Sequence, residues 1–513
     1  MEYWSILLSI VISALGIHYL FRNYNFFKRH DVIHVPSVPI LGNMTSVIFR
    51  RISMADFICK IYNFNPDAKY FGFYAMTNPI FLLRDPEIIK SILVKNFEAF
   101  HNRRSLSVLN EPLFANNLLF LHGQKWRDVR TLLSPSFTSS KMKMMFTLMS
   151  ECAVDFANFL STSIPGEKSD MNMKDVFTKY TNDVIATCAF GIKINSMKDP
   201  TNKFYVYGKE ATNFPIMKII FLLTFRTFGR IFNVKIISSH ISNFFKDIIR
   251  TTIATRDAEN IIRPDMIQLM MDIRGKRERK ELDIDDMAAQ AFIFSFASFE
   301  TTSTTISFVA HEIATNPDVQ VKLRQEIDQI LEESNGQVTF EIINQFQYLD
   351  AIIKETLRLY PAIILERVCD ETYELPPALP DEKPFTMKKG MTVWIPAYAI
   401  HHDAKYYDDP EKFRPERFLD NKMYHNSPCY MPFGLGPRMC IANRFAMLEV
   451  KVLLFHLLAR CELKPCAKTT IPLKFSKKGV MLKPEGGFWL NVQCRSDMHP
   501  VLQSTITNSV AKS

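Results

Sequence analysis

The pattern of apolar and polar residues along the chain predicts a mainly helical protein with a few short strands. Residues 68–84 alternate often enough to form strands, most of residues 85–360 carry helical patterns, and strand-like segments return at 364–400 and 471–494. A helix-dominated chain with small sheets near its edges is typical of the α+β class. The 513 residues contain no internal repeat, low-complexity tract or glycine/serine linker, so one large domain is expected.

One helix is predicted to be much longer than the others. It extends from Asp283 to Asn316, where aspartates suit the first turn and Pro317 ends the helix. At ~1.5 Å per residue, it reaches about 50 Å and can cross a whole domain. Its middle holds Glu300 and neighbouring hydroxyl side chains within an apolar stretch.

The presence of Glu300 in an apolar stretch can be explained in two ways. Burying a carboxylate is unfavourable unless the group is paired or hydrated, and hydroxyls such as that of Thr301 can bond back to the carbonyl one turn earlier and bend a helix. Both effects suit a site that handles protons beside a ligand. The alternative is that Glu300 lies on the solvated face of the helix, against which Phe294, Phe296 and Phe299 argue.

The N-terminal apolar run predicts a membrane anchor. Tyr3 to Phe21 is nearly uncharged, just long enough for one span, and followed by positive residues that would keep the rest of the chain in the cytosol. A cleaved signal peptide is the alternative, but it would want a basic start, and this start is acidic. The predicted organisation is an anchor at 1–21, a basic and proline-rich hinge at 22–43, a folded domain at 44–498 and a polar tail at 499–513.

A second segment suggests contact with a membrane. Residues 214–237 are rich in phenylalanine, isoleucine and leucine, contain four basic residues and no acid, and are too short and too charged to span. An interfacial patch and a core helix with basic ends are both compatible with this pattern.

The net charge and the cysteines limit the kinds of partner and the cellular environment that the sequence predicts. A net charge of +9 fits an acidic membrane surface or an acidic protein partner, and without a lysine/arginine block nucleic acid is not expected as a partner. The nine cysteines are an odd number with no C-x-x-C pair, which favours reduced thiols facing the cytosol over a disulfide framework.

Cys440 ends the most informative stretch, Pro432 to Cys440. Gly434 and Gly436 leave room for a tight loop whose N–H groups can point at the sulfur, and Arg438 can reach an anionic group beside a bound metal. A helix predicted from Ala442 to Leu458 would put the sulfur just before a helix N-terminus, where a thiolate is stabilised. A structural cysteine in a glycine turn is the alternative.

The spacing Phe-x-x-Gly-x-Arg-x-Cys, filled at every defined position, resembles the haem-binding loop of the cytochrome P450 family. Other stretches resemble the family in the order that it uses, and the "FETT" and "PFGLGPR" runs are similar to microsomal, insect-type members related to the animal drug-metabolising group. The resemblance implies one large, mainly helical haem domain with small peripheral sheets behind an N-terminal anchor. Two departures are Ser298, in place of a usual glycine in the long helix, and Ala442, in place of glycine after the cysteine.

The resemblance also implies a site. Cys440 would be the axial ligand of the iron of haem b, shielded by Phe433, while Glu300 and Thr301 would relay protons. The implied partners of the haem propionates are Arg103, Trp126, Arg130, Arg367 and Arg438. A buried triad of Glu355, Arg358 and Arg417 is implied as structural, and the adjacent His401 and His402 are interpreted as an ordinary loop rather than a metal site.

The implied activity is oxygen insertion into small lipophilic molecules, by hydroxylation or epoxidation, at the endoplasmic reticulum membrane. Electrons would come from a separate NADPH-cytochrome P450 reductase, with cytochrome b5 as a further candidate. Two alternatives remain, a haem-thiolate isomerase or dehydratase without a reductase, and a non-catalytic haem-binding protein. The candidate reductase face comprises Arg127, Lys141, Lys143 and Lys451, for which an ordinary solvated face is equally compatible. Candidate pocket walls, with core packing as the alternative for each, are Phe114, Leu118, Phe120, Phe294, Ala297, Ile363, Ile364, Val480 and Met481.

Overall fold

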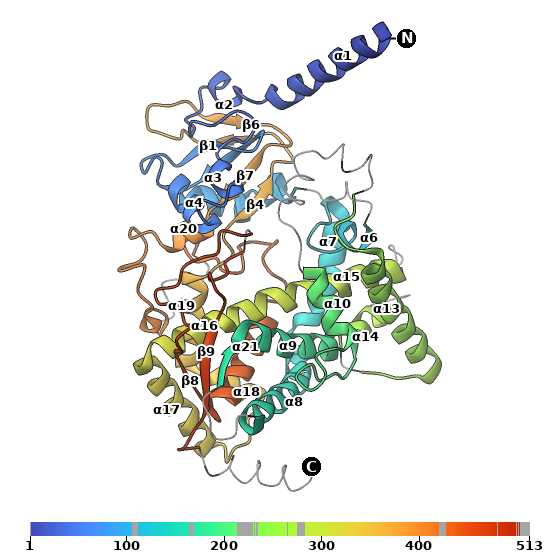
Figure 1. The fold of residues 1–513 in the computed structure, drawn as a ribbon, viewed down its shortest axis with the longest axis vertical. Helices are drawn as coiled ribbons and strands as arrows, with labels where there is room; N and C mark the ends of the chain where they lie inside the picture. Colours follow the sequence, from blue (N-terminus) through green and yellow to red (C-terminus); the bar gives the residue numbers. More distant parts are fainter. Residues whose placement is uncertain are drawn as a thin grey trace.

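The computed structural model describes most of the chain, and its first helix stands apart from the remainder. The described residues are 2–104, 111–163, 169–212, 229, 231, 234–263, 265–273, 283–419, 427–479, 481–498, 500 and 502. Helix α1 (Glu2–Phe21) projects from the body of the protein (Figure 1), and many of its apolar side chains are exposed. Most of the segment 214–237, most of the tail at 499–513 and Val480 lie outside the described residues.

Among the residues that the structure describes, no helix is long and apolar enough to cross a membrane. The transmembrane anchor expected at residues 1–21 is therefore not shown by the fold.

The largest sheet joins the two halves of the chain. It has four strands in the order β1 (Tyr70–Ala75), β2 (Asn78–Leu83), β7 (Thr392–Ile395) and β4 (Leu365–Val368). The hairpin of β1 and β2 is antiparallel, whereas β2 pairs in parallel with β7. Strands were expected in these regions of the sequence, and they form there.

Two smaller sheets complete the β-structure. The first orders β3 (Ser169–Asn172), β9 (Trp489–Cys494) and β8 (Cys461–Lys464), all antiparallel, and the second pairs β5 (Tyr373–Leu375) with β6 (Phe385–Met387). The sequence pattern predicted the region of β9 but missed β3 and β8. The described residues thus form a mainly helical α+β fold, as expected.

The segment between α1 and the first strand packs along β1. Phe27 of α2 (Phe26–Arg29) is fully buried, and a Cβ on Gly72 of β1 would lie 2.4 Å from its ring. Val35 donates its N–H to the Gly72 carbonyl at 2.9 Å, and Gly42 bridges to Ala75. Residues 22–43 are therefore tied to the sheet along much of their length.

The long helix forms where it was expected, with a change of helical type at its centre. It consists of α15 (Ile284–Ala297), the π-helical turn η5 (Ser298–Thr302) and α16 (Ser303–Thr315), with Asp283 capping its start. It crosses the middle of the molecule (Figure 1). Four hydroxyls of this region, those of Thr301, Ser303, Thr305 and Ser307, bond back to carbonyls one turn earlier. π-helical turns often mark functional sites.

The other described helices come before and after this central one in the sequence. Before it come α3 (Thr45–Ile48), α4 (Met54–Tyr62), α5 (Pro86–Lys90), η1 (Ser91–Lys95), η2 (Phe97–Phe100), α6 (Pro112–Ala115), α7 (Gly123–Leu133), η3 (Ser134–Phe137), α8 (Ser139–Ser163), α9 (Met173–Ile185), η4 (Ala186–Phe190), α10 (Lys203–Thr212), α13 (Ser239–Glu259) and α14 (Met266–Ile273). After it come α17 (Pro317–Glu333), α18 (Phe340–Gln345), α19 (Gln347–Leu359), α20 (Ala397–His401), η6 (Pro415–Phe418) and α21 (Asn443–Leu458).

Candidate active site

The loop before α21 is held in a shape that requires glycine. The N–H of Cys440 donates to the Phe433 carbonyl at 2.8 Å, which closes the loop. Gly434 and Gly436 have φ angles of +79° and +74°, which side chains disfavour. At Gly436 a Cβ would also lie 1.9 Å from the carbonyl oxygen of Leu93. Glycine is therefore needed at the two positions for different reasons. At Gly434 only the backbone conformation requires it, because a Cβ would make ordinary contacts, whereas at Gly436 there is also no space for a Cβ.

Cys440 faces an opening while protein surrounds most of its sulfur. The residue is exposed, yet enough protein surrounds it for burial to raise the pKa of its thiol. The Ala442 N–H donates to the sulfur, and Arg130 and Arg103 lower the pKa by their positive charge. Because α21 begins at Asn443, its positive N-terminal end is close to Cys440. These groups favour the thiolate as a metal ligand once a cation is present.

Four arginines gather beside this thiol. Burial lowers the pKa of the guanidinium groups of Arg103, Arg130, Arg367 and Arg438, the last to about 9. Repulsion between positive charges lowers the pKa of Arg367 and of Arg438 further, because the charge of Arg103 is close to both. Trp126 lies against the Arg438 guanidinium, with its ring centroid 4.6 Å away. Two buried cations, Arg367 and Arg438, so close to two half-buried ones need an anionic partner.

Much of their hydrogen-bonding capacity has no partner within the protein. Arg130 donates to the Met439 carbonyl at 3.0 Å and Arg438 to that of Leu121, but Nε and Nη1 of Arg438 and Nε of Arg367 are buried without an acceptor among the described residues. The nearby Glu366 already binds Arg104 and the Trp394 indole. The donors fit a ligand with two carboxylates beside a thiolate-bound iron, which is the arrangement of haem b.

The long helix presents a small residue and a hydroxyl to open space. Ala297 and Thr301, one turn apart, are exposed, although most of their neighbours are buried. The Thr301 hydroxyl donates to the Ala297 carbonyl at 2.7 Å, so its oxygen lone pairs remain able to accept. The turn η5, which contains Thr301, packs against α21, the helix that follows Cys440.

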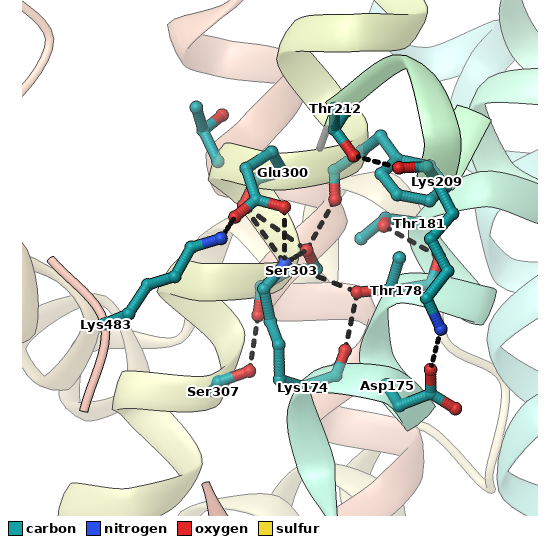
Figure 2. Close-up of polar contacts among 12 residues, drawn as sticks. Lys174, Asp175, Thr178, Thr181, Lys209, Thr212, Glu300, Ser303, Ser307 and Lys483 are labelled. Carbon is teal, nitrogen blue, oxygen red and sulfur yellow. Dashed lines mark hydrogen bonds and ion pairs between the residues drawn. The ribbon is translucent and has the colours of Figure 1, made fainter. Parts of the chain in front are cut away.

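Glu300 points elsewhere, into a lysine-rich network (Figure 2). Its carboxylate is 3.2 Å from Nζ of Lys174 and 2.7 Å from Nζ of Lys483. Lys174 also donates to the Ser303 hydroxyl at 2.6 Å, and burial lowers the pKa of its ammonium to about 8. The solvated-face alternative for Glu300 is thus wrong, since the residue is buried. Neither lysine was expected from the sequence, because both lie far from Glu300 in the chain.

Ser298, the departure from the family pattern, faces a buried acid. Its hydroxyl lies 3.5 Å from Oε2 of Glu449 in α21, and the other oxygen of Glu449 has no hydrogen-bond partner among the described residues. Complete burial raises the pKa of this carboxyl well above its ordinary value. Ser298 therefore joins η5 to α21 through a carboxylic acid whose burial favours the protonated form.

Replacing this acid with its neutral isostere is expected to change how stability depends on pH. Burial raises the pKa of Glu449 in the folded protein above its pKa in the unfolded chain, so the wild-type free energy of unfolding falls as pH rises between these two pKa values. Glu449→Gln removes this group's contribution, which amounts to up to about 1.4 kcal/mol per pH unit. Urea unfolding at pH 5 and pH 8 measures the difference, with Glu462→Gln, a half-buried residue of β8, as the control. Parallel pH dependence of Glu449→Gln and wild type would contradict a raised pKa for Glu449.

The expected triad meets behind the cysteine loop. Glu355 accepts two hydrogen bonds from Arg358, at 2.8 and 2.9 Å, and a third from Arg417 at 3.3 Å, and both Glu355 and Arg358 are fully buried. His401, interpreted from the sequence as part of an ordinary loop, has a structural role here. Its Nε2 accepts the Met431 N–H at 3.0 Å, and its Nδ1 contacts the Arg358 carbonyl. The triad thereby supports the start of the loop that carries Cys440.

Lys451 does not belong to the expected basic face for a protein partner. Lys451 is buried and pairs with Asp350 at 2.6 Å, because α21 packs there against α19. Arg127 and Lys143 form surface pairs with Glu98 and Glu341, respectively. A face for a protein partner therefore cannot include Lys451.

Aromatic rings cluster along the first half of the long helix. Phe114 contacts Phe120, Phe292 and Phe296 with ring centroids 5.6 to 6.1 Å apart. Leu118 lies beside them, and its N–H binds Gln290. Of the other expected wall residues, Phe294 and Ile363 are buried, Ile364 is half-buried and Met481 is exposed. Phe292 and Phe296 of this cluster lie on the same long helix as Ala297 and Thr301, and Phe114 contacts them from α6.

Comparison with known proteins agrees with this geometry. The cytochrome P450 family model matches residues 34–491. Similar curated proteins are cytochrome P450 9e2 of Blattella germanica, 43% identical over 96% of this chain and 98% of the relative, and probable cytochrome P450 9f2 of Drosophila melanogaster, 35% identical over 95% and 98%. Cytochrome P450 6a2 of Drosophila melanogaster is 34% identical over 95% of this chain and 99% of its own length. Similarity over this length shows that the chain belongs to the cytochrome P450 family.

Proposed function

We propose that this protein is a haem-thiolate monooxygenase that hydroxylates or epoxidises small lipophilic molecules. The family binds iron protoporphyrin IX, which when bound supplies the oxygen-activating chemistry. The observation that carries the proposal is the pairing of an exposed Cys440 thiol with buried arginines whose donors have no acceptor among the described residues. In this proposal Cys440 is the iron ligand, and Arg103, Arg130, Arg367, Arg438 and Trp126 hold the propionates.

In this proposal, different residues support the thiolate and deliver protons. Phe433 would shield the sulfur, and the Ala442 N–H would stabilise the thiolate once it binds the iron, partly offsetting the burial that raises the pKa of the thiol. Thr301 offers its oxygen lone pairs to a donor in the open space beside Ala297. Glu300 would supply protons through its lysine partners, because Lys174, with a pKa of about 8, can exchange a proton near neutral pH.

An apolar substrate is supported by the rings that adjoin the open face of the long helix. The cluster of Phe114, Phe120, Phe292 and Phe296 offers edges and faces without charge, which suits lipophilic ligands. We further propose that the protein acts at the endoplasmic reticulum membrane, where the exposed apolar side chains of α1 would contact lipid and the catalytic domain would face the cytosol.

Electrons are proposed to come from NADPH-cytochrome P450 reductase, a separate chain, with cytochrome b5 as a second candidate donor. The exposed Lys143 and the half-buried Arg127 and Lys141 remain for docking an acidic surface. An ordinary solvated face remains the alternative for these residues.

Thr301→Ala is the experiment that tests the proposal. Without the hydroxyl, product formed per NADPH consumed should fall about tenfold or more, because the group that would relay protons within the site is lost. Reductase-supported turnover with a panel of lipophilic substrates measures this ratio. Thr305→Ala is a matched control, because its hydroxyl makes the same kind of backbone bond, at 3.0 Å, one turn further on.

Three outcomes separate the candidate functions. Unchanged turnover and coupling in Thr301→Ala would overturn the proton-delivery assignment. Product formation without NADPH or reductase would favour a haem-thiolate isomerase or dehydratase. Haem binding without any turnover across the panel, in the wild type, would favour a non-catalytic haem protein.

A further inference from the structure

Two cysteines lie directly opposite each other in the sheet of β3, β9 and β8. Cys461 begins β8 and Cys494 ends β9, and the antiparallel register pairs them. The next pair outward, Arg460 and Arg495, is joined by a backbone bond of 2.9 Å from the Arg495 N–H to the Arg460 carbonyl. Hydrogen-bonded and non-hydrogen-bonded pairs alternate along an antiparallel ladder, so the cysteines occupy a non-hydrogen-bonded pair, with Cα atoms about 4.5 Å apart. This separation lies within the range that a disulfide spans.

The two thiols differ in the way that an attacking and a resolving cysteine differ. Cys494 is exposed, whereas Cys461 is completely buried. The Cys461 thiol hydrogen-bonds to the Cys494 sulfur, which lowers the pKa of Cys494 and, together with burial, raises that of Cys461. Cys494 is therefore the more nucleophilic sulfur at neutral pH and the one that a soluble oxidant can reach.

The surroundings favour this chemistry over metal binding. Among the described residues no group of three histidine, cysteine or acidic side chains could hold a metal ion, and two thiols alone make an incomplete zinc site. The Cys494 sulfur also lies 3.2 Å from the Ser161 carbonyl of α8, which holds it beside β8. Both thiols are free in this structure.

We propose that Cys494 and Cys461 form an oxidation site at which a hydroperoxide, such as hydrogen peroxide, produces an intrachain disulfide. The Cys494 thiolate attacks one peroxide oxygen, the O–O bond breaks, and a sulfenic acid forms while hydroxide leaves and takes a proton to become water. The Cys461 sulfur then attacks the sulfenic sulfur, the S–O bond breaks, and a second water leaves with the thiol proton. In total two thiols lose two electrons and two protons, and the peroxide is reduced to two waters.

The position of the pair gives this oxidation a consequence. The residues between Cys461 and Cys494 include Lys483, which pairs with Glu300 at 2.7 Å. A disulfide would close this segment into a covalent loop and restrict how far it can separate from the long helix. Oxidation would thus keep Lys483 close enough to Glu300 to maintain their ion pair. This consequence relies on the proposed function, whereas the disulfide itself does not.

The test uses the full haem-loaded protein, fully reduced and then treated with hydrogen peroxide. After alkylation of the remaining thiols, digestion with a protease that cuts after glutamate separates Cys461 from Cys466 by cleavage at Glu462, so mass spectrometry can assign the linkage. We expect a Cys461–Cys494 peptide pair, two hydrogens lighter than its reduced parts, with seven of the nine cysteines left as thiols or as the haem ligand. Reduction by dithiothreitol should restore all of them.

Three variants make the outcome decisive. In Cys461→Ser the sulfenic acid on Cys494 should persist and be trapped by dimedone, whereas Cys494→Ser should leave Cys461 reduced. Cys466→Ser, a nearby half-buried cysteine, is the matched control and should keep the linkage. Failure of the wild type to form this linkage at peroxide levels that oxidise other thiols of the chain, or a linkage that uses Cys466, would overturn the proposal.

Discussion

Cys440→Ser is expected to reduce monooxygenase turnover to background. A serine hydroxyl is a much weaker acid than a thiol and would stay neutral, whereas the Ala442 N–H, Arg130 and Arg103 partly offset the burial that raises the pKa of the Cys440 thiol. The arginine cluster is untouched, so the variant should still bind haem through its propionates. The carbon-monoxide difference spectrum of the reduced protein reports the ligand, and the long-wavelength Soret band of a thiolate-ligated haem should be replaced by a band at shorter wavelength.

Cys429→Ser is the matched control for this change. Cys429 is half-buried, eleven positions earlier in the same region, and burial raises the pKa of its thiol. The variant should keep both the long-wavelength band and turnover. Retention of that band in Cys440→Ser would show that another residue binds the iron and would sink the site proposed here.

Glu355→Ala is expected to produce the largest loss of stability. The change leaves Arg358, which is fully buried, and Arg417 without the carboxylate that accepts their hydrogen bonds. Breaking a buried ion pair by removing one partner typically costs about 3–5 kcal/mol, because the remaining charge stays desolvated. Urea unfolding and the yield of haem-loaded protein measure the effect, since the triad supports the loop of Cys440 through His401.

A surface ion pair provides a control for the loss of stability expected in Glu355→Ala. Lys322 pairs with Glu416 at 3.0 Å, but its side chain is 57% exposed, so Lys322→Ala should change stability far less. Equal midpoints of unfolding for Glu355→Ala and Lys322→Ala would contradict a structural role for the triad.

The sequence predicted those features that depend on nearby residues. The long helix from Asp283 to Asn316 was recognised by its capping aspartates and terminal proline, and the strands near residues 68–84 by their alternation. The closed loop before Cys440 followed from the conformational freedom of its glycines. Each of these signals lies within a few residues of the feature that it specifies.

Features that depend on distant residues were missed or misassigned. Whether a lysine lies on a surface or pairs in the interior depends on its neighbours in space, so Lys451 looked like a docking residue although Asp350 of α19 binds it. For the same reason, neither Lys174 nor Lys483 could be joined to Glu300 from the sequence. The sequence marked Ser298 only as a departure from the family pattern and could not show its contact with Glu449, a residue that the packing of η5 on α21 brings near.

The interleaving of early and late strands has a consequence for synthesis on the ribosome. The hairpin of β1 and β2 emerges early, but its open edge stays unpaired until β7 has been translated, and β3 waits for β9 near the end of the chain. Unpaired edges invite aggregation while they persist. A message that stopped after Lys464 would yield a chain that contains Cys440 and the arginine cluster, yet β3 and β8 would lack the central strand that joins them.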